Sequence, residues 1–445
     1  MRILFVTPYV PSLIRVRPFN FIKQLAKRHE VTLVCLLHDE HDAAAVEQMR
    51  EYCESVYAIP LSKARSLMSC CRRLLTPVPL QAAYTDLPSA RDLVTQVATN
   101  GAFDVLHVEH IRGAHLAKGV SLTARVYDSV DCITRLLKQK LAHRIGAFER
   151  ALSYEELLKM RSYEPRIAAT FDSVVITSER DRRALGLLIR RFVRSGRIVA
   201  TRTGRDAADR YGQGREVPPA DDSDTDVGGL TGNGVSRVAV VRNGVDSEYF
   251  RPMAAQVDAS SIVFSGRMSY FANASAALQF YREVFPRVRR SRPDAKFKIV
   301  GSDPPDAVRK LAGDPAVEVT GSVPDMRPHL ASAGVAVCPL TIGVGIQNKA
   351  LEAMAMGKPV VATPLACSGI PDAIDGRHLV RATEPARMAE AILGLMDDPE
   401  YASGLGERAW RFVEDRYSWE AAVRELEAVY ARTVEMHKSR VGAAA

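Results

Sequence analysis

The fold of this chain is decided by residues 339–359, which read PLTIGVGIQNKALEAMAMGKP. A buried strand is predicted to end at Pro339, and a loop with two glycines follows it. A helix is predicted from about Gln347 to Met356, with Gly357 as its C-terminal stop. A strand, a loop and a helix in this order form one unit of a parallel α/β sheet.

The loop and the start of this helix have the features of an anion site. Glycines at positions 343 and 345 allow backbone N–H groups to approach an anion, and the helix N-terminus adds partial positive charge. Lys349 lies in the first turn, and Glu352 follows three residues later on the same side. A diphosphate would fit beside the lysine, and a ribose could place its hydroxyls on the carboxylate. The alternative is an ordinary loop followed by an exposed Lys349–Glu352 ion pair.

Short β-branched runs alternate with amphipathic stretches through most of the chain, which is typical of βα units that wind a parallel sheet. The first series of predicted strands covers residues 2–7, 31–36, 56–59, 105–108, 125–127 and 173–177. The second series covers residues 238–241, 262–265, 297–300, 317–320, 335–339 and 359–363. Because 445 residues are too many for one ordinary core, the sequence predicts an α/β protein with two Rossmann-like parallel-sheet domains.

The predicted domains are residues 1–200 and residues 237–415. Between them, residues 201–236 are rich in Gly, Asp, Ser and Thr and nearly free of large apolar side chains. Such a composition buries too little surface to offset the entropy of ordering, so we expect a mobile linker that lies away from the chemistry. Residues 416–445 are predicted to form an amphipathic C-terminal helix with a tail that frays from Val441.

Composition restricts the class of protein. A hydrophobic fraction of 47% and a charged fraction of 25% are typical of a globular protein without membrane spans. The N-terminal apolar run is too short for a secretory signal, and the seven cysteines are scattered without zinc-ligand spacing. We therefore expect a cytoplasmic protein with no structural metal.

The net charge of +8 is compatible with nucleic acid, an anionic membrane or anionic substrates. Basic and apolar residues are interspersed in residues 63–75 and again in residues 135–144. One interpretation is a solvated helix face whose leucines pack on a core. The other is peripheral docking on an anionic membrane, at the inner membrane face. No recognised nucleic-acid module accompanies the charge, so no nucleic-acid partner is expected.

Four motifs occur in a specific order and spacing. They are residues 171–179 (FDSVVITSE), 243–252 (NGVDSEYFRP), 264–267 (FSGR) and 351–363 (LEAMAMGKPVVAT). They resemble, in this order, the last strand of the first domain, the entry into the second domain, its first strand with the phosphate loop, and the donor-site helix of the GT-B glycosyltransferases. Within that fold the chain resembles the retaining family 4, and exopolysaccharide sugar transferases of bacteria in particular.

The resemblance implies two domains that face each other across a cleft, with the nucleotide on the C-terminal one. It implies transfer of a sugar from a nucleoside diphosphate sugar to a sugar or lipid-linked sugar acceptor, with retention and without a required metal or other cofactor. By position, Glu352 would hold the ribose hydroxyls, and Arg267 with Gly266 the diphosphate. The backbone of Gly343 and Gly345 would meet the phosphate and the sugar.

The chain departs from the family pattern at two places. The first of the family's paired glutamates would fall at Val344, and a lysine usually found shortly after the phosphate-loop arginine is missing from residues 268–273. Lys349 is a candidate replacement for that cation and, as a catalytic residue, would neutralise the leaving diphosphate.

A second candidate site follows the predicted strand 105–108. Glu109 and His110 would lie at the C-terminal edge of a parallel sheet, where ligands bind in open α/β folds. In similar transferases a histidine or a glutamate at about this position faces the reacting sugar, and the sequence does not decide between the two. Asp128 and Asp131, after the next strand, are weaker candidates of the same kind.

Three other functions remain open from the sequence. A nucleotide-sugar 2-epimerase of the same architecture would need a Gly-Gly and Glu-Glu segment that residues 343–347 do not supply. A binding protein that kept the fold and lost catalysis is compatible with Val344. Nucleic-acid binding is supported only by net charge. The base, the sugar and the acceptor are not determined by the sequence.

Overall fold

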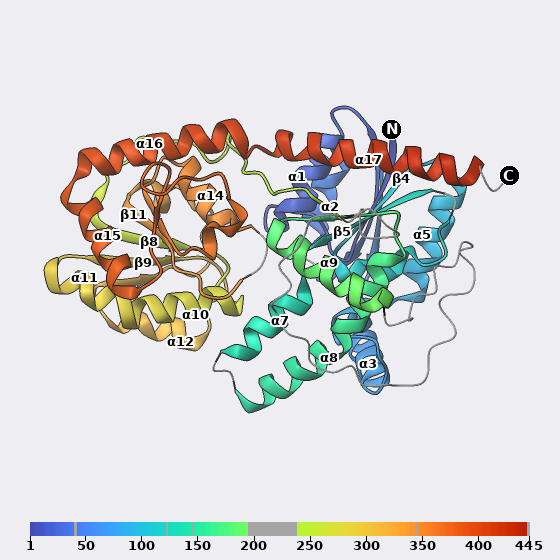
Figure 1. The fold of residues 1–445 in the computed structure, drawn as a ribbon, viewed down its shortest axis with the longest axis horizontal. Helices are drawn as coiled ribbons and strands as arrows, with labels where there is room; N and C mark the ends of the chain where they lie inside the picture. Colours follow the sequence, from blue (N-terminus) through green and yellow to red (C-terminus); the bar gives the residue numbers. More distant parts are fainter. Residues whose placement is uncertain (40–41, 122, 144–145, 195–237, 344–345, 443–445) are drawn as a thin grey trace.

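The computed structural model describes residues 1–39, 42–121, 123–143, 146–194, 238–343 and 346–442. These residues form two α/β domains, each built on one parallel β-sheet (Figure 1). The predicted fold class is therefore confirmed. The predicted linker 201–236, the Val344 and Gly345 positions and the last three residues of the tail lie outside the described residues. Helix α17 continues to Gly442, and the predicted fraying from Val441 stays a prediction.

The first sheet has seven strands in the order β3-β2-β1-β4-β5-β6-β7. Its strands are β1 (Arg2–Thr7), β2 (Glu30–Leu37), β3 (Ser55–Pro60), β4 (Val105–Glu109), β5 (Ala124–Val130), β6 (Ser173–Ile176) and β7 (Val238–Val240). Residues 238–241 were predicted to open the second domain, and this prediction is wrong. Strand β7 pairs in parallel with β6, with Val174 opposite Val238, so the first domain extends beyond the predicted linker.

The helices of the first domain cover both faces of its sheet. They are α1 (Val16–Leu25), α2 (Asp42–Arg50), α3 (Lys63–Arg73), α4 (Leu80–Tyr84), α5 (Pro88–Asn100), α6 (His110–Gly113), α7 (Ile133–Ala142), α8 (Ala147–Ala169) and α9 (Glu179–Arg194). Alternate side chains of each strand point to opposite faces, so β1 contributes Ile3 and Phe5 to one core and Leu4 and Val6 to the other.

The second sheet has six strands in the order β10-β9-β8-β11-β12-β13. Its strands are β8 (Asp258–Ser265), β9 (Lys296–Val300), β10 (Val317–Val319), β11 (Ala333–Cys338), β12 (Val360–Ala362) and β13 (Val380–Arg381). Its helices are α10 (Phe271–Gln279), α11 (Phe285–Ser291), α12 (Asp306–Arg309), α13 (Arg327–Ala331), α14 (Asn348–Ala355), α15 (Pro385–Asp397) and α16 (Pro399–Arg416). The two-residue strand β13 has no predicted counterpart.

Both sheets reverse their strand order at one point, between β1 and β4 in the first sheet and between β8 and β11 in the second. Ligands of open α/β sheets bind beyond the carboxyl ends of the strands at such a reversal. Glu109 ends β4, Gly266 follows β8, and the glycine loop follows β11. The order of the strands therefore brings every predicted site segment to one of these two edges.

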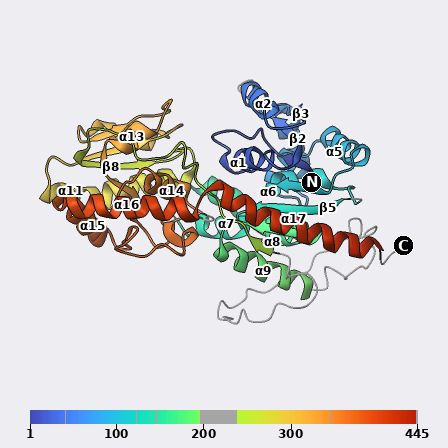
Figure 2. The ribbon, with the colours of Figure 1, turned by 90° about the horizontal axis from the view of Figure 1, so that it is seen from above.

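The chain crosses between the domains twice, at neighbouring positions. Residues 241–245 lead into the second domain, and α17 (Trp419–Gly442) returns to pack on the first (Figures 1 and 2). The N–H of Val245 donates to the Tyr417 carbonyl oxygen at 2.7 Å. A Cβ atom on Gly244 would lie 2.3 Å from the Trp419 nitrogen, so only glycine allows the two crossing segments to approach this closely.

Neither a membrane-spanning helix nor a disulfide bond occurs in the described structure. No described helix combines the length and the apolar character that a membrane span needs. All seven cysteines are free, and most of them are buried.

Candidate functional site

The helix predicted from residues 347–356 is α14, and Gly357 ends it with a φ of +68°, as its predicted role as a stop requires. The Lys349 ammonium donates to Gln347 Oε1 at 3.2 Å. No hydrogen bond or ion pair joins Lys349 to Glu352 in the described part of the chain. The alternative of an exposed Lys349–Glu352 ion pair is therefore not found.

The phosphate loop predicted at Gly266 lies directly against Lys349. Gly266 has a φ of +145°, and a Cβ atom there would lie 3.0 Å from Lys349 Cε and 2.9 Å from Asn273 Nδ2. The positive φ favours glycine here, and any larger residue would also displace the Lys349 and Asn273 side chains. The next residue, Arg267, is exposed; its Nε atom lies 2.9 Å from Ser269 Oγ and 3.6 Å from an Asp303 carboxylate oxygen. Two cationic side chains of the predicted site are thus brought together around Gly266.

Glu352 is half-buried on the same helix as Lys349, and burial raises the pKa of its carboxyl to about 7, an effect that the Lys349 ammonium partly offsets. Within the described residues, its carboxylate has neither a hydrogen-bond partner nor an ion-pair partner. Its position suits two adjacent hydroxyls of a bound ribose.

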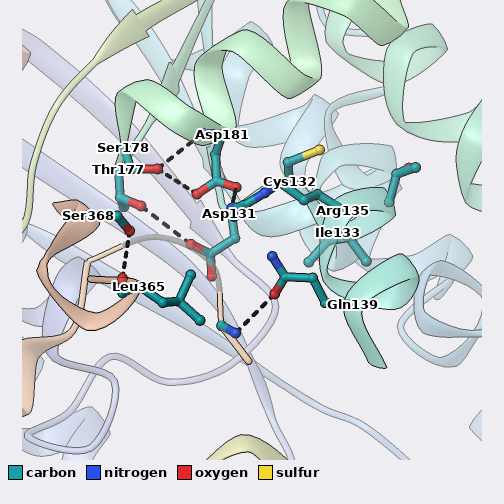
Figure 3. Close-up of polar contacts among 12 residues, drawn as sticks. Asp131, Cys132, Ile133, Arg135, Gln139, Thr177, Ser178, Asp181, Leu365 and Ser368 are labelled. Carbon is teal, nitrogen blue, oxygen red and sulfur yellow. Dashed lines mark hydrogen bonds and ion pairs between the residues drawn. The ribbon is translucent and has the colours of Figure 1, made fainter. Parts of the chain in front are cut away.

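Helix α7 of the first domain contacts the second domain at this site. The N–H of Gly343 donates to Gln139 Oε1 at 3.0 Å, and the Lys140 ammonium lies 5.2 Å from the centre of the Phe271 ring. Figure 3 shows Gln139 with this bond, beside Asp131 and near Leu365 and Ser368 of the second domain. Gln139 was not predicted from the sequence, because its partner is more than 200 residues away.

Glu109 is completely buried at the end of β4. The Tyr9 hydroxyl donates to Glu109 Oε1 at 3.0 Å, whereas Oε2 has no partner among the described residues. Burial and the nearby Asp128 carboxylate raise the pKa of Glu109 to about 8. Near neutral pH this side chain is thus mainly a carboxylic acid, which can donate a proton.

His110 follows Glu109 with a φ of +63°, a left-handed conformation that a non-glycine residue rarely adopts. Its Nδ1 atom accepts a hydrogen bond from the Arg112 N–H at 3.3 Å. Burial, with the charges of Arg112 and Arg15, lowers the pKa of His110 to about 3. Near neutral pH both side chains are therefore uncharged, but only Glu109 carries an acidic proton that it can donate.

The two aspartates after β5 have different environments. Asp128 is paired with Arg17 at 2.7 Å in the interior. Asp131 is half-buried and accepts a hydrogen bond from the Thr177 hydroxyl at 3.3 Å (Figure 3). Burial and the Asp181 carboxylate raise the pKa of Asp131 to about 7. The Asp128 carboxylate is therefore engaged in a buried ion pair with Arg17. Asp131 lies on the side of the first domain that faces the second domain.

Comparisons with known proteins show which proteins this chain resembles. Residues 259–398 match the family described as "Glycosyl transferases group 1". Over 265 residues, the chain is 27% identical to a D-inositol 3-phosphate glycosyltransferase of Catenulispora acidiphila, which covers 54% of this chain and 60% of that protein. Over 175 residues, it is 30% identical to a phosphatidyl-myo-inositol mannosyltransferase of Mycolicibacterium smegmatis, covering 38% of this chain and 44% of that protein. The chain thus spans about half of the curated relatives that it matches.

Solved structures extend the likeness to the whole fold. HepE of Anabaena, in complex with UDP, superposes with a TM-score of 0.60 at 14% identity and covers 97% of this chain and 100% of that one. Sucrose-phosphate synthase of Thermosynechococcus elongatus superposes with a TM-score of 0.63 at 15% identity and covers 97% and 99%. Together with the family match, these likenesses confirm the resemblance to GT-B glycosyltransferases.

Proposed function

We propose that this chain is a glycosyltransferase that moves a sugar from a nucleoside diphosphate sugar to an acceptor, with retention, in the synthesis of a polysaccharide or another glycoconjugate. The observation that carries the proposal is the convergence of Gly266, Lys349 and Glu352. Gly266 of one loop contacts the Lys349 side chain in the first turn of α14, and the half-buried Glu352 carboxyl follows on the same helix, close enough for the lysine charge to act on it. They match the diphosphate and the ribose of such a donor.

The proposal does not specify which sugar is transferred or which acceptor receives it. The relatives named above act on inositol phosphate and phosphatidylinositol by their names, and HepE was solved in complex with UDP. These likenesses support a nucleotide-sugar donor and a sugar-containing acceptor for this chain. A comparison of donors that carry different bases decides which nucleotide it uses.

Incubation of the purified protein with UDP-, GDP-, ADP- and dTDP-sugars tests the proposal. We expect release of the nucleoside diphosphate together with a glycosylated acceptor or, without acceptor, slow hydrolysis. Tight donor binding without turnover would indicate a binding protein of the same fold. Interconversion of the nucleotide sugar would indicate an epimerase.

Replacement of Glu352 by alanine is expected to weaken donor binding about 10- to 100-fold, equivalent to ~1.5–3 kcal/mol for hydrogen bonds to a charged group. The loss should be measured by calorimetry with a nucleoside diphosphate, because this ligand contains the ribose but no transferable sugar. Glu318→Ala removes an exposed carboxylate of β10 in the same domain and is the control. Unchanged affinity in a folded Glu352→Ala protein would remove Glu352 from the site.

Transfer is expected to continue in EDTA, because Arg267 and Lys349 supply positive charge where the diphosphate would lie. Turnover should be measured before and after exhaustive chelation, and again after addition of Mg²⁺ or Mn²⁺. Complete loss of turnover that either ion restores would mean that a metal neutralises the diphosphate.

The surface of α3 supports peripheral contact with an anionic membrane. Leu67 and Met68 of α3 are exposed, as are Leu74 and the 98%-exposed Leu75 directly after it, and the helix also exposes Lys63, Arg65 and Arg72. The leucines of this stretch therefore do not pack on a core, unlike Leu137 in the second basic stretch, which is buried. Apolar side chains flanked by cations fit the boundary between lipid tails and anionic headgroups.

The double variant Leu67→Ser/Leu75→Ser is expected to bind vesicles with 30% phosphatidylglycerol at least about 10-fold more weakly, because each exposed leucine can bury apolar surface worth up to ~2 kcal/mol. Cosedimentation measures the effect. Ile374→Ser, at an exposed position of the second domain, is the control. Equal binding of wild type and the double variant, or equal binding to neutral vesicles, would contradict membrane contact through α3.

A further inference from the structure

A chain of polar side chains connects the two halves of the proposed site. Arg17 of α1 donates from Nε to Asp128 Oδ2 at 2.7 Å, and its Nη1 atom donates to the Val241 carbonyl oxygen at 3.1 Å and to Asn243 Oδ1 at 2.6 Å. Asn243 then donates from Nδ2 to Asn348 Oδ1 at 3.1 Å. The chain therefore runs from a central strand of the first domain, through the crossing segment, to the first residue of α14.

Each end of this chain lies next to a candidate catalytic residue. On the first domain, Asp128 of β5 is the register partner of Glu109 on β4, and its charge acts on the Glu109 carboxyl. On the second domain, Asn348 directly precedes Lys349 in α14. Arg17 thus lies between the acid on the acceptor side and the cation on the donor side.

The contacts of Arg17 restrict it to one position. Arg17 is 4% exposed and Asp128 is fully buried, so neither can exchange its partner for water without a large cost. The guanidinium also lies 4.5 Å from the centre of the Phe21 ring. Since the same guanidinium bonds the backbone of Val241 and the side chain of Asn243, the crossing segment is fixed to the first domain at this point.

We propose that Arg17, Asn243 and Asn348 are positioning residues that set where Lys349 lies relative to Glu109. The proposal rests on the proposed transfer reaction, in which the leaving diphosphate and the acceptor side must meet in one geometry. These residues act through Lys349 and Glu109. A displacement of about 1 Å between reacting groups lowers turnover by up to ~10²-fold, so loosening this connection should reduce kcat rather than donor affinity.

Asn348→Ala tests the proposal, because it removes one hydrogen bond from a half-buried side chain and leaves the Arg17–Asp128 pair intact. We expect kcat to fall about 10- to 100-fold while the dissociation constant of the nucleoside diphosphate changes less than about threefold. Hydrogen exchange should become faster at residues 242–245 and 348–351. Asn243→Ala should have the same effects.

Asn20→Ala is the matched control. Asn20 is a buried asparagine of the same helix as Arg17, and its side chain donates to the Val16 carbonyl oxygen of its own helix at 2.7 Å. The Asn20→Ala protein should lose stability without a change in kcat or in hydrogen exchange at residues 242–245. Turnover in Asn348→Ala equal to wild type, or a loss of donor affinity as large as the loss of kcat, would overturn the proposal. Faster exchange in a protein that transfers no sugar from any donor would support the connection and contradict the proposed function.

Discussion

Replacement of Lys349 by alanine is expected to lower kcat about 10²–10³-fold, the effect of removing one preorganised group that stabilises developing charge. The leaving nucleoside diphosphate gains negative charge as the glycosidic bond breaks. Lys349 lies against Gly266 of the proposed phosphate loop, and its ammonium is held by a neutral partner, the Gln347 amide, at 3.2 Å. The charge therefore remains available to the diphosphate, and the donor KM should change less than kcat.

Lys349→Arg should recover part of the lost turnover, because the charge returns with a different shape. Lys310→Ala, which removes an exposed lysine of the same domain, separates the local effect from the loss of one unit of net charge. Steady-state kinetics with varied donor gives both constants. A rise in KM at constant kcat would make Lys349 a binding contact and reject its role in the departure of the leaving group.

Glu109→Gln is expected to lower turnover about 10²–10⁴-fold if the buried acid transfers a proton in the reaction, as is usual for a general acid or base. The substitution keeps the acceptor for the Tyr9 hydroxyl, which limits changes in structure. His110→Ala is the comparison, because the sequence alone did not decide between the two residues. A Glu109→Gln protein with wild-type turnover would leave His110 as the candidate on this side.

The same substitution is expected to stabilise the protein above neutral pH. The pKa of Glu109 is raised to about 8 in the folded chain, mainly by burial, so between its ordinary value and 8 the folded state holds a proton that the unfolded state has lost. Stability of the wild type therefore falls as pH rises through this window. Glu109→Gln should match wild type near pH 4 and exceed its stability by roughly 4 kcal/mol near pH 8.

Urea unfolding at several pH values measures this difference. Glu47→Gln, at an exposed glutamate of α2, should show no comparable dependence on pH. A stability difference between Glu109→Gln and wild type that stays constant from pH 4 to pH 8 would mean that Glu109 ionises normally.

The elements that carry the proposed donor site could be predicted from the sequence because their signals are local. The strand that ends before Pro339, the helix that contains Lys349 and Glu352, and the stop at Gly357 all depend on residues a few positions apart. The contact between Gly266 and Lys349 could not be predicted from their positions in the sequence, because the two residues lie far apart along the chain. It was implied only by the resemblance of two separate motifs to one family.

The features that the sequence did not predict depend on contacts between distant residues. Strand β7 belongs to the first sheet because it pairs with β6, and nothing within residues 238–240 specifies that partner. Gln139 and Arg17 read as ordinary helix residues until their partners Gly343 and Asn243 are known. The pKa of Glu109 likewise depends on burial that only the packed sheet produces. Val344, Gly345 and residues 201–236 remain predictions.

The neighbouring crossings at Val245 and Tyr417 have a consequence for protein engineering. Because α17 returns to the first domain, the second domain is an insertion within the first, and its two junctions lie 2.7 Å apart at one hydrogen bond. The second domain could be replaced, between these two junctions, by the corresponding domain of another GT-B protein. The N-terminal and C-terminal ends would remain on the first domain, so under the proposed function the hybrid should keep its acceptor side and change its nucleotide-sugar donor.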